Sequence, residues 1–277
     1  MTQRERVASF RRMHENGPLL LPNAWDAASA RVIELAGAQA IGTTSAGVSW
    51  AYGRRDGHRL RRDEMIDAIR RIVEAVEVPV TADIEGGYGT GSIEDVAETV
   101  RAVVELGVVG INLEDASGDG GTTPLLDPEL QAERIRAARA AAAAMGGDLF
   151  INARTDVYLA QVGEPESRLE ATIERANLYL AAGADGVFVP GVTAPGTIEA
   201  LARAIDGPLN VMWSPGAPTV PDLARLGVAR VSVGPAFALA ALATTRLATR
   251  ELLERGTYRA LEQCLTFGEV DGMFARV

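Results

Sequence analysis

The sequence predicts an α/β protein that folds as a (β/α)8 barrel of the TIM type. Eight short apolar segments of strand length alternate with helical segments along 277 residues. Strict alternation of this kind is typical of a parallel sheet covered by helices, and eight units in this length are typical of a closed barrel. A doubly wound open sheet is the alternative. We expect a single barrel domain over residues 1–277.

The strand predictions rest on short apolar runs, and the helix predictions on apolar periodicity and capping residues. The predicted strands span residues 19–25, 40–45, 78–83, 108–114, 149–154, 186–189, 209–213 and 230–233. The predicted helices span residues 4–14, 26–37, 63–76, 92–107, 128–145, 167–182, 194–205, 219–226 and 236–255. Residues 45–59 are predicted to form a loop, and loops of this length are often functional.

The C-terminal part of the chain carries more apolar residues than a closed barrel needs to cover. Leucine, phenylalanine, valine and methionine recur through residues 257–277. Apolar surface of this kind more often docks on a partner than stays in water. We therefore expect residues 236–277 to form a helical segment used in oligomerisation.

The composition excludes several classes of chemistry. The net charge is −10 and all 27 basic residues are arginine, so Schiff-base chemistry and pyridoxal phosphate attachment are absent and binding to nucleic acid is disfavoured. His14 and His58 are the only histidines, which excludes a multi-histidine metal site. The lone Cys264 excludes intrachain disulfides, and we expect it in the core, on a helix. With no signal peptide or membrane span, a cytoplasmic protein is expected.

Polar residues gather at the predicted C-terminal ends of the strands, where barrel enzymes carry their active sites. Side chains two residues apart on a strand face the same way, which groups Asp83 with Glu85 and Asn112 with Glu114. The residues expected at these ends are Trp25, Asp26, Ser45, Asp83, Glu85, Asn112, Glu114, Asn152, Arg154, Asp156, Pro190, Trp213, Ser214 and Gly234. If Asp83 and Glu85 stood alone, a solvated acidic loop would be the simpler interpretation. The polar residues at many strand ends favour a functional site instead.

These residue types suit a metal-assisted reaction on a small acid. Asp83, Glu85 and Glu114 offer hard oxygen ligands for Mg²⁺, with Mn²⁺ as an alternative, partly through water. Arg154 can hold a carboxylate in a bidentate manner, although an ion pair with Asp156 competes with this role. Backbone N–H groups of residues 45–47 can receive an anionic oxygen. The set predicts a 2-oxo acid bound through its keto oxygen and carboxylate.

Six segments in this order resemble the isocitrate lyase and phosphoenolpyruvate mutase superfamily. They are LPNAWDAASA, TTSAG, YGRRDG, VTADIEGGYG, GINLED and INARTD, and the resemblance spans roughly residues 17–240. It implies a Mg²⁺-dependent barrel that forms or cleaves carbon–carbon or carbon–phosphorus bonds next to a 2-oxo or enolate group. It also implies exchange of a C-terminal helix between subunits, and hence a homodimer or homotetramer.

The resemblance assigns roles to individual residues. The metal-site acids would be Asp56, Asp83, Glu85 and Glu114, and Arg154 and Asp56 would be catalytic. The substrate-binding residues would be Ser45, Ala46, Gly47, Asn112, Arg154, Trp25 and Trp213. For Asp56, a structural salt bridge to the neighbouring arginines or His58 is the alternative, and His58 itself is expected to be a solvated loop residue.

The chain also departs from the superfamily pattern. The lyase branch carries a K-K/R-C-G-H loop with the catalytic thiol, whereas residues 117–127 here read SGDGGTTPLLD. The lysine- and asparagine-bearing loop of the mutase and phosphonopyruvate hydrolase branch is missing as well. Thr43, Glu85 and Pro190 stand where the superfamily often has an aromatic residue, an aspartate, and a glutamate or histidine. The sequence thus retains the residues of the barrel scaffold and of the metal site, but not the loop residues that complete catalysis in the superfamily.

The sequence thus predicts a Mg²⁺-dependent lyase acting on a carbon–carbon bond next to the 2-oxo or enolate group of a small di- or tricarboxylic acid. One alternative is an oxaloacetate-type decarboxylase or hydrolase, which needs no thiol. Another is carbon–phosphorus chemistry on phosphonopyruvate or phosphoenolpyruvate. The last is a non-catalytic protein that binds a 2-oxo acid.

Overall fold

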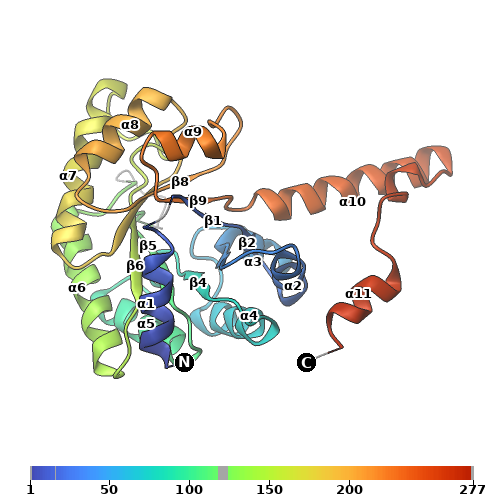
Figure 1. The fold of residues 1–277 in the computed structure, drawn as a ribbon, viewed down its shortest axis with the longest axis horizontal. Coiled ribbons are helices and arrows are strands. Elements are labelled where there is room, and N and C mark those ends of the chain that lie inside the picture. The colour runs from blue at the N-terminus through green and yellow to red at the C-terminus, as the bar shows by residue number, and fades with distance from the viewer. Residues whose placement is uncertain (1, 16, 118–123, 276–277) are drawn as a thin grey trace.

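A computed structural model describes residues 2–15, 17–117 and 124–275 (Figure 1). Nine parallel strands in these residues form one sheet, in the order β1-β9-β8-β7-β6-β5-β4-β3-β2. The strands are β1 (Leu19–Leu21), β2 (Asn23–Ala24), β3 (Ile41–Thr43), β4 (Val80–Asp83), β5 (Gly110–Glu114), β6 (Phe150–Arg154), β7 (Gly186–Val189), β8 (Leu209–Met212) and β9 (Arg230–Ser232).

The sheet closes into a barrel because β1 and β2 are two halves of the first predicted strand. Leu19 of β1 pairs with Arg230 of β9, while Asn23 of β2 pairs with Gly42 of β3. The break falls at Pro22, which has no N–H to donate to a ladder. Eight strand positions therefore surround the barrel, so the predicted (β/α)8 fold is confirmed and the open doubly wound sheet is wrong.

The predicted helices are present with ends shifted by one or two residues. Those around the barrel are α2 (Ala27–Leu35), α4 (Arg62–Ala75), α5 (Ile93–Glu105), α6 (Pro128–Ala144), α7 (Arg168–Ala181), α8 (Pro195–Ala204) and α9 (Val220–Arg225). The remaining long ones are α1 (Gln3–Arg12), which precedes β1, and α10 (Ala236–Arg255), which follows β9. Short 3-10 turns, η1 (Pro165–Ser167) and η2 (Arg259–Leu261), complete the described elements together with α3 and α11 below.

The prediction of a loop over residues 45–59 is wrong in its first half. Residues Ser45–Ala51 form helix α3, which starts after Thr44 at the end of β3. The absence of a side chain at Gly47 serves packing here. A Cβ atom added to Gly47 would lie 2.7 Å from Cβ of Trp25. The glycine thus allows α3 to pack closely against the end of the first strand.

Alternate residues along the strands face two different surroundings. Ile111 and Leu113 of β5 join the buried apolar cluster that includes Val100 of α5 and Ile135 of α6. Asn112, between the two apolar residues, instead accepts a 2.9 Å hydrogen bond from Asn152 in the barrel interior. The outer face of the sheet is therefore apolar beneath the helices, whereas the interior is polar and leads up to the strand ends.

Helix α10 leaves the barrel and extends away from it (Figure 1). The chain then turns back, and α11 (Phe267–Met273) returns toward α2, where Arg31 donates a 2.8 Å hydrogen bond to the Met273 carbonyl. Cys264 lies between η2 and α11 and is exposed, so the expectation of a buried helical cysteine is wrong. None of the described helices is long and apolar enough to cross a membrane.

Candidate active site

A cavity of about 180 Å³ opens at the C-terminal ends of the strands. Seven of the residues predicted for the site line it, and they come from α3, the following loop, β4, β5, β6 and the segment after β9. These residues are Ser45, Ala46, Asp56, Asp83, Asn112, Arg154 and Gly234. The strand-end rule for parallel barrels therefore selects residues that the fold brings together around one cavity.

Asp83, the last residue of β4, is held from one side only. Its Oδ2 accepts hydrogen bonds from the Ser45 backbone N–H at 3.1 Å and from Ser45 Oγ at 2.8 Å. Its Oδ1 is buried and has no hydrogen-bond partner among the described residues. The Ser45 N–H that the sequence suggested for a substrate anion is thus engaged with Asp83, and the second carboxylate oxygen remains for a cation.

Arg154, the last residue of β6, is bound to two carboxylates. Its Nε and Nη2 donate to Asp156 at 2.6 and 2.8 Å, and its Nη1 lies 2.7 Å from Glu114 Oε2. The structural ion pair with Asp156 is therefore real. A guanidinium has five N–H groups, so these three contacts still leave donors for a ligand in the cavity that Arg154 lines.

Glu85 does not share the strand face of Asp83, because β4 ends at Asp83 and the backbone of Glu85 is left-handed, with φ of 49°. The expected period-two pairing of these acids is thus wrong in geometry, although both are buried. Glu85 Oε2 accepts a hydrogen bond from the His58 N–H, and its Oε1 accepts one from the Tyr88 hydroxyl at 3.3 Å. The left-handed turn directs Glu85 toward the loop after α3.

His58 connects the acids, and the expectation that it is a solvated loop residue is wrong. Its Nε2 lies 3.6 Å from both Glu85 Oε2 and Glu114 Oε1, and it accepts a 3.0 Å hydrogen bond from the Gly86 N–H. The ligand atoms of His58, Glu85 and Glu114 all lie within 4.8 Å of one another.

The shared burial of these groups shifts their pKa values. Burial raises the pKa of Glu85 to about 7; the charge of His58 opposes this shift and that of Glu114 adds to it. Burial also raises the pKa of Glu114, against the charge of Arg154. Burial lowers the pKa of His58, but its hydrogen bond to Glu114 and the charge of Glu85 outweigh this, and the net shift is upward. Burial is thus the largest single influence on all three groups, and it disfavours their charged forms.

Asp56 lies at the rim of the cavity, in the loop after α3. The side chain is solvent-exposed, yet neighbouring atoms remove part of its hydration, and this raises its pKa, with a further increase from the charge of Asp83. The salt bridge considered from the sequence is not formed with Arg54, which pairs instead with Glu64 at 2.8 Å. Asp56 is therefore a carboxylate that faces the site.

Three residues predicted to bind substrate lie outside this cavity. Trp25 and Gly47 line a separate hollow between the first strand and α10. Trp213 follows β8 and is half exposed, with an exposed fraction of 50%. Their assignment as substrate-binding residues remains a prediction.

Several residues around the site were not predicted from the sequence. Arg134 of α6 is buried and donates hydrogen bonds to the carbonyls of Gly86 and Glu114, so it fixes the loop after β4. No sequence signal distinguishes Arg134 from the other arginines of this alanine-rich helix. Leu159, Phe188 and Met212 also line the cavity. For Phe188 and Met212 a signal existed, because each stands at or next to the end of a predicted strand.

The residues present fit a divalent cation. The unpartnered, buried Oδ1 of Asp83 faces a region with Asp56 nearby, and acids with raised pKa values surround it. Oxygen-rich sets of this kind suit hard cations such as Mg²⁺. Glu85 and Glu114 are already engaged with His58, Tyr88 and Arg154, so they would support the ion through water.

A ring of acids, one arginine and an open cavity at the strand ends of a closed parallel barrel define the chain as a barrel enzyme of the lyase type. The profile of the phosphoenolpyruvate phosphomutase family matches residues 10–253. The chain belongs to this family, and so to the isocitrate lyase and phosphoenolpyruvate mutase superfamily, as the six sequence segments indicated.

The chain is similar to several curated proteins and solved structures. An uncharacterized protein of Mycobacterium tuberculosis is 41% identical over 228 residues, which are 82% of this chain and 81% of the relative. The 2-methylisocitrate lyase of Escherichia coli K12 is 32% identical over 201 residues, covering 70% of this chain and 65% of the lyase. The solved structure of phosphonopyruvate hydrolase with oxalate and Mg²⁺ is 25% identical, with a TM-score of 0.83 and coverage of 96% and 95% of the two chains.

Proposed function

We propose that this chain is a Mg²⁺-dependent lyase that cleaves or forms a carbon–carbon bond next to the 2-oxo or enolate group of a small carboxylic acid. The observation that carries the proposal is the buried, unpartnered Oδ1 of Asp83, which lines the same cavity as Arg154. One group suits a divalent cation and the other a carboxylate.

In this proposal, some residues bind the substrate and others position the residues that bind it. The free N–H groups of Arg154 hold the substrate carboxylate, and Glu114 and Asp156 fix the plane of its guanidinium. Ser45 fixes the carboxylate of Asp83 by two hydrogen bonds, and His58 and Tyr88 fix that of Glu85. When bound, the cation supplies charge stabilisation for an enolate.

A second candidate is hydrolysis or decarboxylation of an oxaloacetate-like acid. It is favoured because the sole cysteine of the chain, Cys264, is exposed between η2 and α11 and does not line the cavity. The thiol loop that the superfamily's lyase branch uses would fall on residues 117–127, of which 118–123 lie outside the described residues. The sequence of that segment contains no cysteine. A reaction that needs no thiol to protonate the leaving group tolerates this composition.

The test is ¹H and ³¹P NMR of the full chain with a panel of 2-oxo acids, hydroxy acids and phosphonopyruvate, with and without Mg²⁺. Metal-dependent appearance of pyruvate or glyoxylate together with a second carboxylic acid supports the lyase. Oxalate with acetate supports the hydrolase, pyruvate with CO2 from oxaloacetate supports the decarboxylase, and pyruvate with phosphate indicates carbon–phosphorus cleavage. Asp83→Asn should abolish turnover and metal binding measured by calorimetry, whereas the control Asp206→Asn, in the exposed turn before β8, should change neither. Line broadening of an acid with metal but without turnover would support a non-catalytic binding protein instead.

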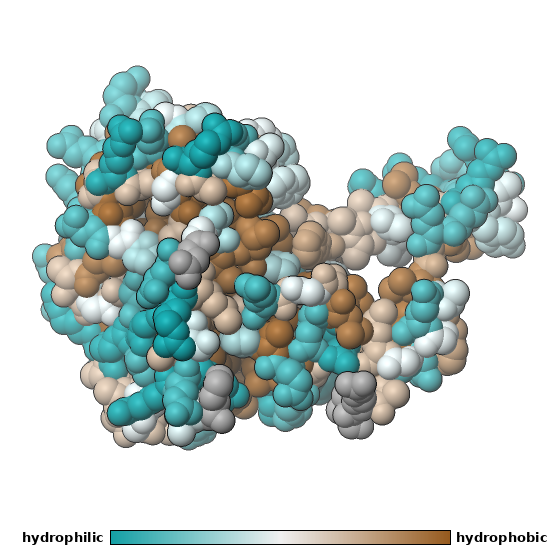
Figure 2. Space-filling view, in the orientation of Figure 1, coloured by the Kyte–Doolittle hydropathy of each residue, from teal (hydrophilic) through white to brown (hydrophobic). Residues whose placement is uncertain are grey.

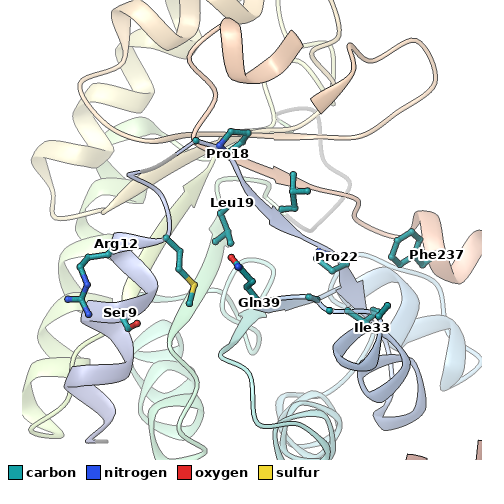
Figure 3. Close-up of a pocket in the computed structure, with 14 residues that line it drawn as sticks. Ser9, Arg12, Pro18, Leu19, Pro22, Ile33, Gln39 and Phe237 are labelled. Carbon is teal, nitrogen blue, oxygen red and sulfur yellow. The ribbon is translucent and has the colours of Figure 1, made fainter. Parts of the chain in front are cut away.

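We further propose that residues 1–277 form one barrel domain whose C-terminal segment, residues 236–277, joins the subunits of a homodimer or homotetramer. A hollow of about 810 Å³ lies on the outside of β1, lined by Leu19, Leu20, Ile33 and Phe237 (Figure 3). Leu20 is half exposed there, and Figure 2 shows hydrophobic surface on this face of the barrel. Helix α10 carries further exposed leucines, at positions 239, 242, 247, 252 and 253.

The apolar hollow and the apolar helix suggest that α10 of a second copy covers the barrel wall. Light scattering on a sizing column gives the assembly size of the full chain. Leu247→Glu with Leu253→Glu should dissociate the assembly, and the matched exposed change Leu130→Glu on α6 should leave it intact. A monomeric wild-type chain would contradict this part of the proposal.

A further inference from the structure

The cavity at the strand ends has a charged side and an apolar side. Asp56, Asp83 and Arg154 belong to the charged side, which the loop after α3, β4 and β6 build. Leu159, Phe188 and Met212 line the cavity as well, and they come from the segment after β6 and from β7 and β8. A ligand that fills the cavity meets both surfaces at once.

We infer that the ligand is a short 2-oxo acid with one carboxylate, at the 2-oxo end, and a small alkyl group at the other end. This inference rests on the proposed function, because the metal and Arg154 take the 2-oxo end. It narrows the di- or tricarboxylic range expected from the sequence to acids without a second carboxylate.

The first argument is the supply of positive charge. Among the described residues that line the cavity, Arg154 is the sole cation, and it already serves Glu114 and Asp156. Residues 118–123, outside the described part, are glycine, aspartate and threonine, so the sequence places no base there. Arg230 lies beneath Asn112, to which it donates a 3.3 Å hydrogen bond, and does not line the cavity. A second carboxylate would therefore be desolvated without a cation to pair with.

The second argument is the apolar wall of the cavity, which begins next to Arg154. Phe188 is buried, and its ring lies under the Arg154 guanidinium, whose Cζ is 5.8 Å from the ring centroid. Met212 and the partly exposed Leu159 continue the apolar surface toward the rim. Each methylene group placed against such a wall improves affinity by roughly fourfold. An alkyl group at this end of the ligand therefore increases the binding affinity, whereas a carboxylate decreases it.

The third argument is size. A volume of about 180 Å³ corresponds to about six water molecules at ~30 Å³ each. That space suits a 2-oxo acid of about five carbon atoms, and it is small for a tricarboxylic acid. Size and charge thus favour the same class of ligand.

The test compares two acids that differ at one end only. 2-Oxopentanoate and 2-oxoglutarate have the same chain length, but the first ends in a methyl group and the second in a carboxylate. Calorimetry of the full chain with Mg²⁺ should show 2-oxopentanoate binding at least tenfold more tightly. Equal or tighter binding of 2-oxoglutarate, with metal dependence intact, would overturn this inference and leave the proposed function standing. Failure of both acids to bind would overturn both.

A charge introduced into the apolar wall sharpens the test. Leu159→Arg at the exposed rim should raise the affinity for 2-oxoglutarate relative to 2-oxopentanoate by tenfold or more. Leu130→Arg makes the same change on the exposed face of α6, away from the cavity, and should leave the ratio at the wild-type value. An unchanged ratio in Leu159→Arg would show that the far end of the ligand does not face this wall, and the inference would be wrong.

Discussion

Arg154 at the mouth of the barrel and Arg230 in its interior have surroundings that act on them in opposite ways. At the mouth, burial lowers the pKa of Arg154, but the charges of Glu114 and Asp156 outweigh it and hold the pKa well above its usual value. In the interior, burial lowers the pKa of Arg230, and the distant charge of Asp83 opposes this only in part. The same side chain is thus stabilised as a cation in one region and destabilised in the other.

Hydrogen bonding shows the same contrast. Arg154 bonds to two carboxylates through three nitrogen atoms. Arg230 donates to the Asn112 side-chain oxygen, and its Nε and Nη1 have no partner among the described residues. Asn112 also accepts from Asn152, so its oxygen is occupied and its amide nitrogen is the atom left for the cavity. The mouth is therefore a balanced ion network, whereas the interior charge orients a neutral amide at a cost in stability.

The largest effect is expected from Arg154→Met. The change leaves Glu114 and Asp156 buried without their cation, and breaking a buried pair typically costs about 3–5 kcal/mol. Turnover should fall by at least 100-fold because the carboxylate of the substrate loses its partner. Urea unfolding and NMR turnover assays measure the two effects. Arg203→Met, on the exposed face of α8, serves as the control and should change neither.

The effect of Arg230→Met should be smaller and of opposite sign for stability. Replacing a buried, poorly paired charge by an apolar side chain is often stabilising, and we expect a gain of about 1–2 kcal/mol in the free energy of unfolding. Substrate affinity should decrease modestly because Asn112 loses one of its two donors. A loss of stability comparable to that of Arg154→Met would show that the interior charge is as well paired as the one at the mouth.

Glu85→Gln tests the raised pKa of Glu85, at the mouth of the barrel, through the pH dependence of stability. Burial raises the pKa of Glu85 from its ordinary value of 4.5 to about 7, so between these pH values the folded state binds more protons than the unfolded state. Wild-type stability must then decrease as pH rises from about 4.5 to 7. In EDTA, Glu85→Gln should gain about 2 kcal/mol relative to wild type on going from pH 4.5 to pH 8. The exposed change Glu166→Gln should show no such trend. If the stability of Glu85→Gln changed with pH in parallel with that of wild type, the raised pKa of Glu85 would be wrong.

Tyr88→Phe should give the smallest effect. It removes the 3.3 Å hydrogen bond to Glu85 and keeps the buried ring. We expect a loss of about 0.5–1 kcal/mol in the free energy of unfolding. The double variant with Glu85→Gln, measured by urea unfolding, gives the coupling between the two side chains. Strict additivity would mean that the hydrogen bond contributes nothing.

The sequence was sufficient for the fold and for the charged side of the cavity. Alternating apolar runs and capping residues are local signals, and they located every strand of the barrel. Asp83, Asn112 and Arg154 could be found because a strand end in a parallel barrel has a known direction. The family match confirms the ordered segments on which the resemblance was based.

The contacts around the site could not be read from local patterns. His58 was missed because its burial depends on Glu85 and Glu114, which are 27 and 56 positions further along the chain. The turn of Glu85 was missed because period-two alternation holds only while the strand continues, and β4 ends at Asp83. Arg134 is an ordinary helix residue by every local criterion, and only the packing of α6 gives it a role.

The break of the first strand at Pro22 has a consequence for how the chain folds. Closing the barrel pairs Leu19 with Arg230, residues that are far apart in sequence, and such non-local contacts form slowly. During synthesis β1 emerges early, and its edge has no partner until β9 follows. Barrel closure is therefore expected to be a late step of folding, and changes in the short β1 segment should affect the refolding rate as well as stability.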